Sequence, residues 1–183
     1  MSSDLSEPGP KKSKTRAAIL TAAERVMSEQ GITNLTLDLV AKEAGISKGD
    51  LLYHFASKDD LITGLLDEGY YRFEQRVNER AEKASDARRG LFRAYVEVTF
   101  AKRRKGSRPG LIGAMILHPD AMSHAREVRK VWQQRLETDG ASAALAELAH
   151  LASIGLAFAE VTNYCPPDED LRQQMIDLLL SCR

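Results

Sequence analysis

This sequence of 183 residues is poor in cysteine and in aromatic residues, and it has no long apolar run. Two cysteines, Cys165 and Cys182, are too few for a disulfide framework and favour a reducing compartment. An aromatic share of 6% disfavours an all-β fold. No apolar stretch approaches the roughly 20 residues that cross a bilayer, and the first residues lack the apolar segment of a secretory signal. We therefore expect a cytoplasmic protein that does not interact with membranes.

The chain also lacks a net charge and the common motifs of catalysis. Its 26 basic and 26 acidic residues balance, so an interaction with nucleic acid must be argued from the local placement of charge. The four histidines lack the spacing of a His-Glu-x-x-His zinc motif, and the sequence has no Gly-x-Ser-x-Gly, P-loop or Cys-x-x-Cys. We therefore expect no enzyme activity, no metal and no cofactor. Cys165 could be a redox sensor, but a buried and inert thiol is the favoured interpretation.

Helical periodicity, in contrast, runs through most of the chain. After a polar arm over residues 1–12, apolar residues recur on one helix face from Ser13 to a stop at Gly31. Thr36 and Ser47 are good N-caps for two short helices, the first of which ends at Gly45 and the second near Phe55. These three helices, separated by short turns, predict a tri-helical unit.

Ser57 opens a long helix that continues to about Lys83 and would span roughly 39 Å, enough to belong to two domains. Prolines punctuate further helices, which we expect at about 86–104, 109–117, 119–138, 142–163 and 168–181. We therefore predict an all-α fold. It comprises a disordered arm at 1–12, a three-helix domain at 13–57, and a C-terminal helical domain at 58–183 that begins with the long helix.

The most informative stretch runs from Thr36 to Leu61 and fits a helix-turn-helix whose second helix enters a major groove. Residues for contacts with phosphates and bases are expected on its outer side, at Thr36, Ser47, Lys48, Gly49, Leu52, Tyr53, His54 and Lys58. Gly49 costs a helix about 1 kcal/mol relative to alanine, and a close approach to DNA is a sufficient reason for it. Taken singly, these residues are explained by packing or by surface charge. Because all of them fall at the positions expected for one helix-turn-helix, DNA binding is the favoured interpretation of the set.

This stretch resembles the signature of the tetracycline-repressor (TetR) family. The positions that match, all in register, are Thr36, Val40–Ala41, Ala44–Gly45, Ser47–Lys48–Gly49, Tyr53–His54–Phe55 and Ser57–Lys58. The resemblance implies a transcription regulator, most often a repressor, that releases DNA when a small molecule binds. Leu52 departs from the family, which often has a groove-reaching residue there, because leucine can touch a thymine methyl but cannot hydrogen-bond a base. Asp50 either caps the helix, which is favoured, or accepts from a cytosine amine.

Basic residues gather in two further places. The loop at 102–108 contains Lys102, Arg103, Arg104 and Lys105, and its ordinary interpretation is a solvated surface. If the helix before it returns antiparallel to the long helix, this loop lies near the DNA and adds non-specific attraction to phosphate. The N-terminal arm is a second candidate for such contacts, through Lys11, Lys12, Lys14 and Arg16.

The helix at 142–163 is apolar on more than one face. The resemblance implies that it and the last helix form a four-helix interface between two copies, with contacts at Leu145, Leu148, Ala152, Gly155, Ala159, Leu171, Met175, Leu178 and Leu179. A homodimer would place two recognition helices about 34–36 Å apart on a palindromic operator. Packing inside one chain is the alternative, which periodicity does not separate from a dimer.

The resemblance also implies a small-molecule pocket within the C-terminal helices. Aromatic and methionine side chains suit varied apolar ligands, and the candidates are Phe92, Tyr95, Phe100, Met115, Met122, Trp132 and Phe158. Polar contacts are expected from His118, Glu160, Asn163 and Tyr164. Each of these residues taken singly is more often part of a core. The rival functions are an enzyme and a helical interaction module that no longer binds DNA. Leu52 is the one residue that favours the interaction module.

Overall fold

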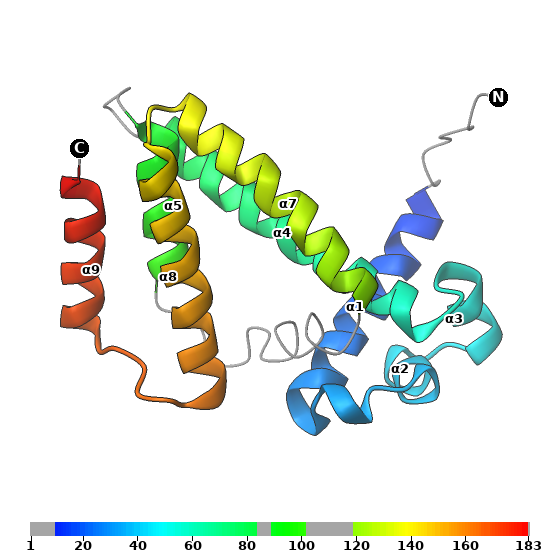
Figure 1. Ribbon diagram of the computed structural model, residues 1–183. Helices are drawn as coiled ribbons and strands as arrows, with labels where there is room; N and C mark the ends of the chain where they lie inside the picture. The colour runs from blue at the N-terminus through cyan, green and yellow to red at the C-terminus, as the bar shows by residue number, and fades with distance from the viewer. Residues whose placement is uncertain (1–9, 84–88, 102–118, 183) are drawn as a thin grey trace, which may run out of the picture. The chain divides into compact units, whose positions relative to one another are not determined.

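Residues 10–83, 89–101 and 119–182 are described by the computed structural model, and every regular element among them is a helix (Figure 1). The all-α prediction is confirmed. The chain divides into two compact units, one of residues 1–66 and 108–121 and the other of residues 67–107 and 122–183. This division falls inside one helix, α4 (Lys58–Glu82), whereas the sequence suggested a boundary just before it.

The first unit contains α1 (Pro10–Gln30), a 3-10 turn η1 (Ile32–Asn34), α2 (Leu37–Ala44), α3 (Lys48–His54) and the start of α4. α1 begins before the expected start at Ser13, so the end of the predicted arm is helical. It ends at Gln30 because Gly31 has a φ of 82°, which a β-carbon disfavours. Side chains from all of these helices are buried together: Ile19, Leu20, Val26, Leu35, Val40, Leu51, Phe55, Leu61, Ile62, Leu65 and Leu66.

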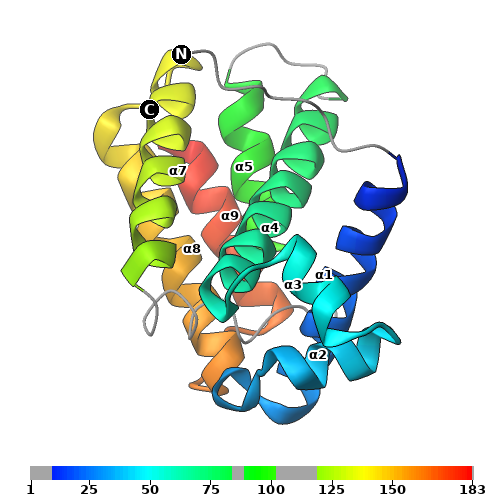
Figure 2. The same ribbon diagram turned by 90° about the vertical axis from the view of Figure 1, so that its right-hand side faces the viewer.

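The second unit contains the rest of α4, α5 (Gly90–Phe100), α7 (Pro119–Thr138), α8 (Ala143–Thr162) and α9 (Glu169–Ser181) (Figure 2). α4 and α7 run side by side in the same direction, because Asp67 pairs with His124 and Glu74 pairs with Arg135. All five helices contribute to one core, which includes Val77, Phe92, Tyr95, Phe100, Trp132, Leu136, Leu145, Ala149, Leu156 and Leu179.

Arg89 fixes one end of this second unit. It stands before α5 with a left-handed backbone, φ 57°. Its guanidinium donates from Nε to the Gly140 carbonyl at 3.1 Å and from Nη1 to the Cys182 carbonyl at 2.6 Å. The start of α5 therefore lies beside the end of α9, and these two packed helices are antiparallel.

Two expectations from the sequence need correction. The helix expected at 86–104 is the shorter α5, which ends at Phe100 because the backbone of Ala101 leaves the helical region at ψ 136°. Cys165 is exposed rather than buried, since it lies in the loop before Pro166 and Pro167, where no helix can continue. The helix expected at 109–117 and the basic loop at 102–108 lie outside the described residues.

Among the described helices, α8 alone is long and apolar enough, by length and composition, to cross a membrane. Only 28% of its apolar window is buried within the chain. Much of α8 therefore presents an apolar surface that the other described helices leave uncovered.

Candidate DNA-binding interface and ligand core

Local hydrogen bonds fix both ends of the turn between α2 and α3. The Thr36 hydroxyl accepts from the Leu39 amide at 3.2 Å and caps α2, while Gly45 ends α2 with a left-handed φ of 68°. Ser47 and Asp50 form a reciprocal capping box at the start of α3. The Asp50 carboxylate accepts from the Ser47 amide and hydroxyl at 3.3 and 2.7 Å, as the favoured cap interpretation requires. The Ser47 hydroxyl therefore serves the cap and orients α3.

α3 is amphipathic in the way that the sequence predicted. Leu51 and Phe55 are buried, whereas Leu52 is 40% exposed and Tyr53 is 67% exposed. The ring of half-buried His54 lies edge-on to the ring of Tyr53, with centroids 5.3 Å apart. An apolar residue and a phenol therefore stand together on the open side of a short, capped helix.

The cation at the start of α3 has a partner that sequence reasoning missed. Lys48 Nζ lies 3.0 Å from Asp38 Oδ2 on α2, and both side chains are more than half exposed. An exposed pair of this kind contributes at most about 1 kcal/mol, so a phosphate can compete for the lysine. Lys58, the other predicted cation, is half-buried in the first turn of α4.

Gly49 and Gly64 have opposite surroundings. A β-carbon on Gly49 would meet only Ser47 Oγ, at an ordinary 3.7 Å. A β-carbon on Gly64 would lie 2.7 Å from Phe55 Cε1 and 3.1 Å from Arg16 Nη2. Packing thus explains the glycine on α4, where the Phe55 ring lies against the helix, and it leaves the glycine on α3 without an internal reason.

Arg16 does not belong to a flexible basic arm, because it lies within α1 with its guanidinium 5.2 Å from the centre of the Phe55 ring. This cation–π contact helps to hold the end of α3 and was not evident from the sequence. Lys14 is also within α1 and is exposed. The side chains of Lys11 and Lys12 lie outside the described part of the chain.

Most of the predicted ligand residues come together in the core of the second unit. Phe92, Tyr95, Phe100 and Trp132 are all buried there. Phe73, which the sequence did not single out for this role, completes an aromatic cluster with Tyr95 and Trp132, whose ring centroids are 5.3–5.5 Å apart. The guanidinium of Arg135 lies 4.3 Å from the centre of the Trp132 ring. Four of the predicted ligand residues therefore lie together in one apolar core.

Other members of the predicted ligand set lie elsewhere. Phe158 is 48% exposed on α8, so it is not part of this cluster, and the prediction for it needs correction. Met122 is half-buried at the start of α7, while Met115 and His118 lie outside the described residues. An open hollow of about 430 Å³ over Leu91 and the end of α7 contains none of the predicted ligand residues.

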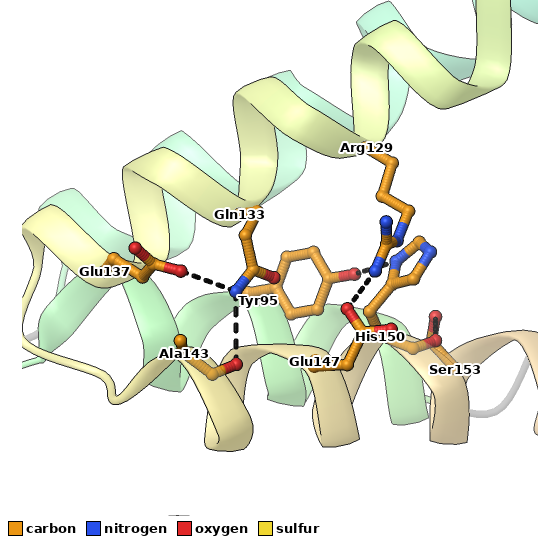
Figure 3. A network of polar contacts seen from close by, with 8 residues as sticks. All are labelled: Tyr95, Arg129, Gln133, Glu137, Ala143, Glu147, His150 and Ser153. Carbon is orange, nitrogen blue, oxygen red and sulfur yellow. Dashed lines mark hydrogen bonds and ion pairs between the residues drawn. The ribbon is translucent and has the colours of Figure 1, made fainter. Parts of the chain in front are cut away.

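A polar network borders the aromatic cluster (Figure 3). The Tyr95 hydroxyl lies 3.3 Å from His150 Nδ1, and Arg129 pairs with Glu147 beside them. Burial raises the pKa of Tyr95 to about 12, although a hydrogen bond from Ser153 opposes the shift. Burial, with help from Arg129, lowers the pKa of His150. Both groups are therefore uncharged at neutral pH, and they form a neutral polar edge on an apolar core.

α8 and α9 both carry apolar side chains that the described chain leaves exposed. They are Leu148, Leu151, Ile154 and Phe158 on α8, and Leu171 and Leu178 on α9. Ala152, Ala159 and Met175 are half-buried and Gly155 is exposed. Leu145 and Leu179, both predicted for a dimer interface, are instead buried in the chain's own core, which is a correction to two of the nine predicted contacts.

Both units match families of known proteins. Residues 19–65 match the family described as bacterial regulatory proteins, tetR family, and residues 89–182 match the tetracyclin repressor-like C-terminal domain. The chain is 41% identical over 54 residues to the HTH-type transcriptional regulator TtgR of Pseudomonas putida and 29% identical over 97 residues to the HTH-type transcriptional regulator EthR of Mycobacterium tuberculosis. These matches cover 30% and 51% of this chain, and only 26% and 45% of the two relatives.

Solved structures agree in fold along nearly the whole chain. The multidrug binding protein EbrR, in complex with imidazole, has a TM-score of 0.71 at 22% identity and covers 100% of this chain and 99% of its own. A TetR family member from Streptomyces coelicolor A3 has a TM-score of 0.72 at 25% identity, with coverage of 91% and 98%.

Proposed function

This chain belongs to the TetR family of transcription regulators, and from that premise we propose that it is a repressor that a small organic molecule releases from a palindromic operator. The observation that carries the proposal is the pair of units itself. One presents a capped recognition helix with an exposed outer side, and the other encloses an aromatic core with a neutral polar edge.

DNA binding is assigned to the outer side of α3 and to the start of α2. Lys48 leaves its weak ion pair with Asp38 and binds a phosphate. The side chains of Tyr53 and His54 donate hydrogen bonds to the DNA backbone nearby. Leu52 supplies an apolar contact suited to a thymine methyl. Gly49 keeps the backbone of α3 bare at the point of closest approach, which explains a glycine that no internal contact requires. Ser47 and Asp50 hold the helix in place without needing to touch a base.

A homodimer is assigned to the apolar face of α8 and α9. Six exposed apolar side chains on two neighbouring helices form a larger patch than scattered surface residues do. A second copy placed by a two-fold axis covers that face with the same residues, since the two halves of such an interface are identical. Burial in this dimer also explains why α8 is so apolar, and α8 then need not cross a membrane. We therefore place the protein in the cytoplasm.

The ligand is assigned to the core of the second unit. Phe73, Tyr95 and Trp132 offer ring faces and edges, and the uncharged pair of Tyr95 and His150 offers a hydrogen bond without a fixed charge. This chemistry favours an uncharged aromatic molecule. α4 belongs to both units and is the element through which we expect ligand binding to change the affinity for DNA.

The test is a gel-shift titration of the purified protein against DNA that flanks its own gene. Lys48→Ala and Tyr53→Ala should weaken a specific shift, whereas Tyr71→Ala, which removes an exposed tyrosine from α4, should leave it unchanged. If the folded protein shifts neither this DNA nor any sequence selected from a random pool, the DNA-binding assignment is wrong. The chain would then act as a helical interaction module.

A further inference from the structure

Two buried polar atoms of the second unit have no hydrogen-bond partner among the described residues: Thr99 Oγ1 and Arg172 Nη1. Thr99 is 4% exposed and Arg172 is 6% exposed. Buried hydroxyl and guanidinium groups nearly always have partners, because an unpaired donor loses its water without compensation. Two such atoms in one unit therefore require an explanation.

The two atoms lie at the same end of the pair formed by α5 and α9. Arg89, at the start of α5, binds the carbonyl of Cys182 at the end of α9. Thr99 follows Arg89 by ten residues and Arg172 precedes Cys182 by ten, so each lies about 15 Å along its helix from this bond. Because the helices are antiparallel, Thr99 and Arg172 reach the same level, where α5 ends and α9 begins (Figure 1).

Among the described residues, the positive charge of Arg172 already has a carboxylate partner. Arg172 Nη2 lies 2.7 Å from Glu160 Oε1, and Arg172 Nε donates to the Pro167 carbonyl at 3.1 Å. Of the three guanidinium nitrogens, only Nη1 has no partner in the described chain, and its N–H groups can donate to a further acceptor. An anionic group there would leave a net negative charge buried, which is costly, whereas an uncharged acceptor would not. A carbonyl oxygen is such an acceptor, and the Thr99 hydroxyl can donate to it as well.

Thr99 also continues the ligand core. Tyr95 lies four residues before it and Phe92 seven residues before it, so the three share one face of α5. Tyr95 belongs to the aromatic cluster with Phe73 and Trp132. An aromatic molecule that lies along this face would place one end near Thr99 and Arg172.

We propose that Thr99 and Arg172 form the polar end of the ligand site, and that the ligand is an uncharged aromatic molecule with a carbonyl-type acceptor. The proposal rests on the assignment of the ligand to this unit. A second copy docked on the open face of α8 and α9 does not meet the need, because neither atom has accessible surface. A group of a ligand that enters the interior of the second unit would supply the acceptor that both atoms lack.

The probes are fluorenone and fluorene, two rigid aromatic molecules of the same shape that differ by one carbonyl, with fluorene carboxylate as the anionic probe. Equilibrium dialysis against the full chain should show fluorenone binding about tenfold more tightly than fluorene, as a hydrogen bond to a charged donor predicts. Fluorene carboxylate should bind more weakly than fluorenone. Equal affinities for fluorenone and fluorene, tighter binding of the carboxylate, or no binding of either neutral probe would each overturn the proposal.

Two conservative variants test whether Thr99 and Arg172 are the source of the preference for fluorenone over fluorene. Thr99→Val removes the unpaired hydroxyl at the same shape. Arg172→Lys keeps a positive charge for Glu160 but removes Nη1, together with the Nε donor to the Pro167 carbonyl. Each should bring the affinities for fluorenone and fluorene close together, while Thr138→Val on the surface of α7 should not. A preference that persists in both variants contradicts the assignment. The gel shift without a probe reports on DNA binding separately, so a failed preference beside a specific shift refutes this inference alone.

Discussion

Replacing Gly49 with alanine should make the protein more stable and a weaker DNA binder. Gly49 lies within α3, and its new β-carbon would meet only Ser47 Oγ at 3.7 Å. Alanine is favoured over glycine in a helix by up to about 1 kcal/mol, and the gain should be about 0.5–1 kcal/mol in this first turn. For a chain of this size that corresponds to a rise in Tm of about 1–4 °C. Thermal and urea unfolding at one fixed protein concentration measure it.

Gly64→Ala is the matched control, with the opposite expected sign. Its β-carbon would lie 2.7 Å from Phe55 Cε1 in a buried site, so the ring or the helix must move. Overpacking of this kind costs about 1–3 kcal/mol, which offsets or exceeds the gain in helix propensity. The two variants make the same chemical change, so the difference in their free energies of unfolding isolates the packing cost.

The DNA affinity of Gly49→Ala decides between packing and function. A β-carbon at the point of closest approach should weaken operator binding about tenfold or more, equivalent to about 1.4 kcal/mol. Gel-shift titration beside the unfolding data measures both properties in one preparation. A variant that is stabilised and binds the operator as tightly as the parent chain would refute the reasoning, and so would a destabilised one.

Three further predictions concern the dimer face, the α2–α3 ion pair and the ligand core. Leu151→Glu should convert a dimer to a monomer in analytical ultracentrifugation, while Val131→Glu, an equally exposed site on α7, should remain dimeric; a dimeric Leu151→Glu would contradict the assigned face. Asp38→Asn removes the partner of Lys48 and one negative charge, so it should tighten DNA binding up to about fivefold at low salt, and weaker binding would mean that Asp38 positions the lysine. Because burial lowers the pKa of His150 below 6.5, the unfolded chain binds a proton that the folded chain does not, and stability falls as the pH drops below that value. His150→Gln should therefore reduce the loss of stability between pH 7 and pH 5 in urea unfolding, and an unchanged loss would exclude this role.

Features set by neighbouring residues were predictable from the sequence. The caps at Thr36 and Ser47 and the helix ends at Gly31 and Gly45 all follow from the residue types and from contacts within a few positions. The recognition helix was placed correctly for the same reason. The helical register after the Ser47 cap puts Leu51 on the inner side and Tyr53 on the outer side, as the structure has them.

Features set by distant contacts were not predictable. α8 is apolar on more than one face, so its periodicity does not say which side faces inward, and Leu145 and Phe158 were assigned to the wrong sides. The contact of Arg16 with Phe55 joins residues that are far apart in the chain, so no pattern of neighbouring residues predicts it. The partnership of Lys48 with Asp38 likewise depends on how α2 and α3 cross. These errors share one cause, because a pattern along the chain defines a face but not what covers it.

The division of the chain within α4 limits how its parts can be exchanged. A fragment that stops at residue 57 would lack Leu61, Ile62, Leu65 and Leu66, which belong to the first unit and are each at most 3% exposed in the full chain. Such a fragment loses one wall of its core and should not fold, although it contains the whole helix-turn-helix. A chimera that joins this DNA-binding unit to another sensor must therefore carry α4 at least through Leu66 and make its junction beyond that residue, in mid-helix and in register. Recombination between relatives meets the same constraint, so a new specificity for DNA is inherited together with the first turns of the helix that leads to the sensor.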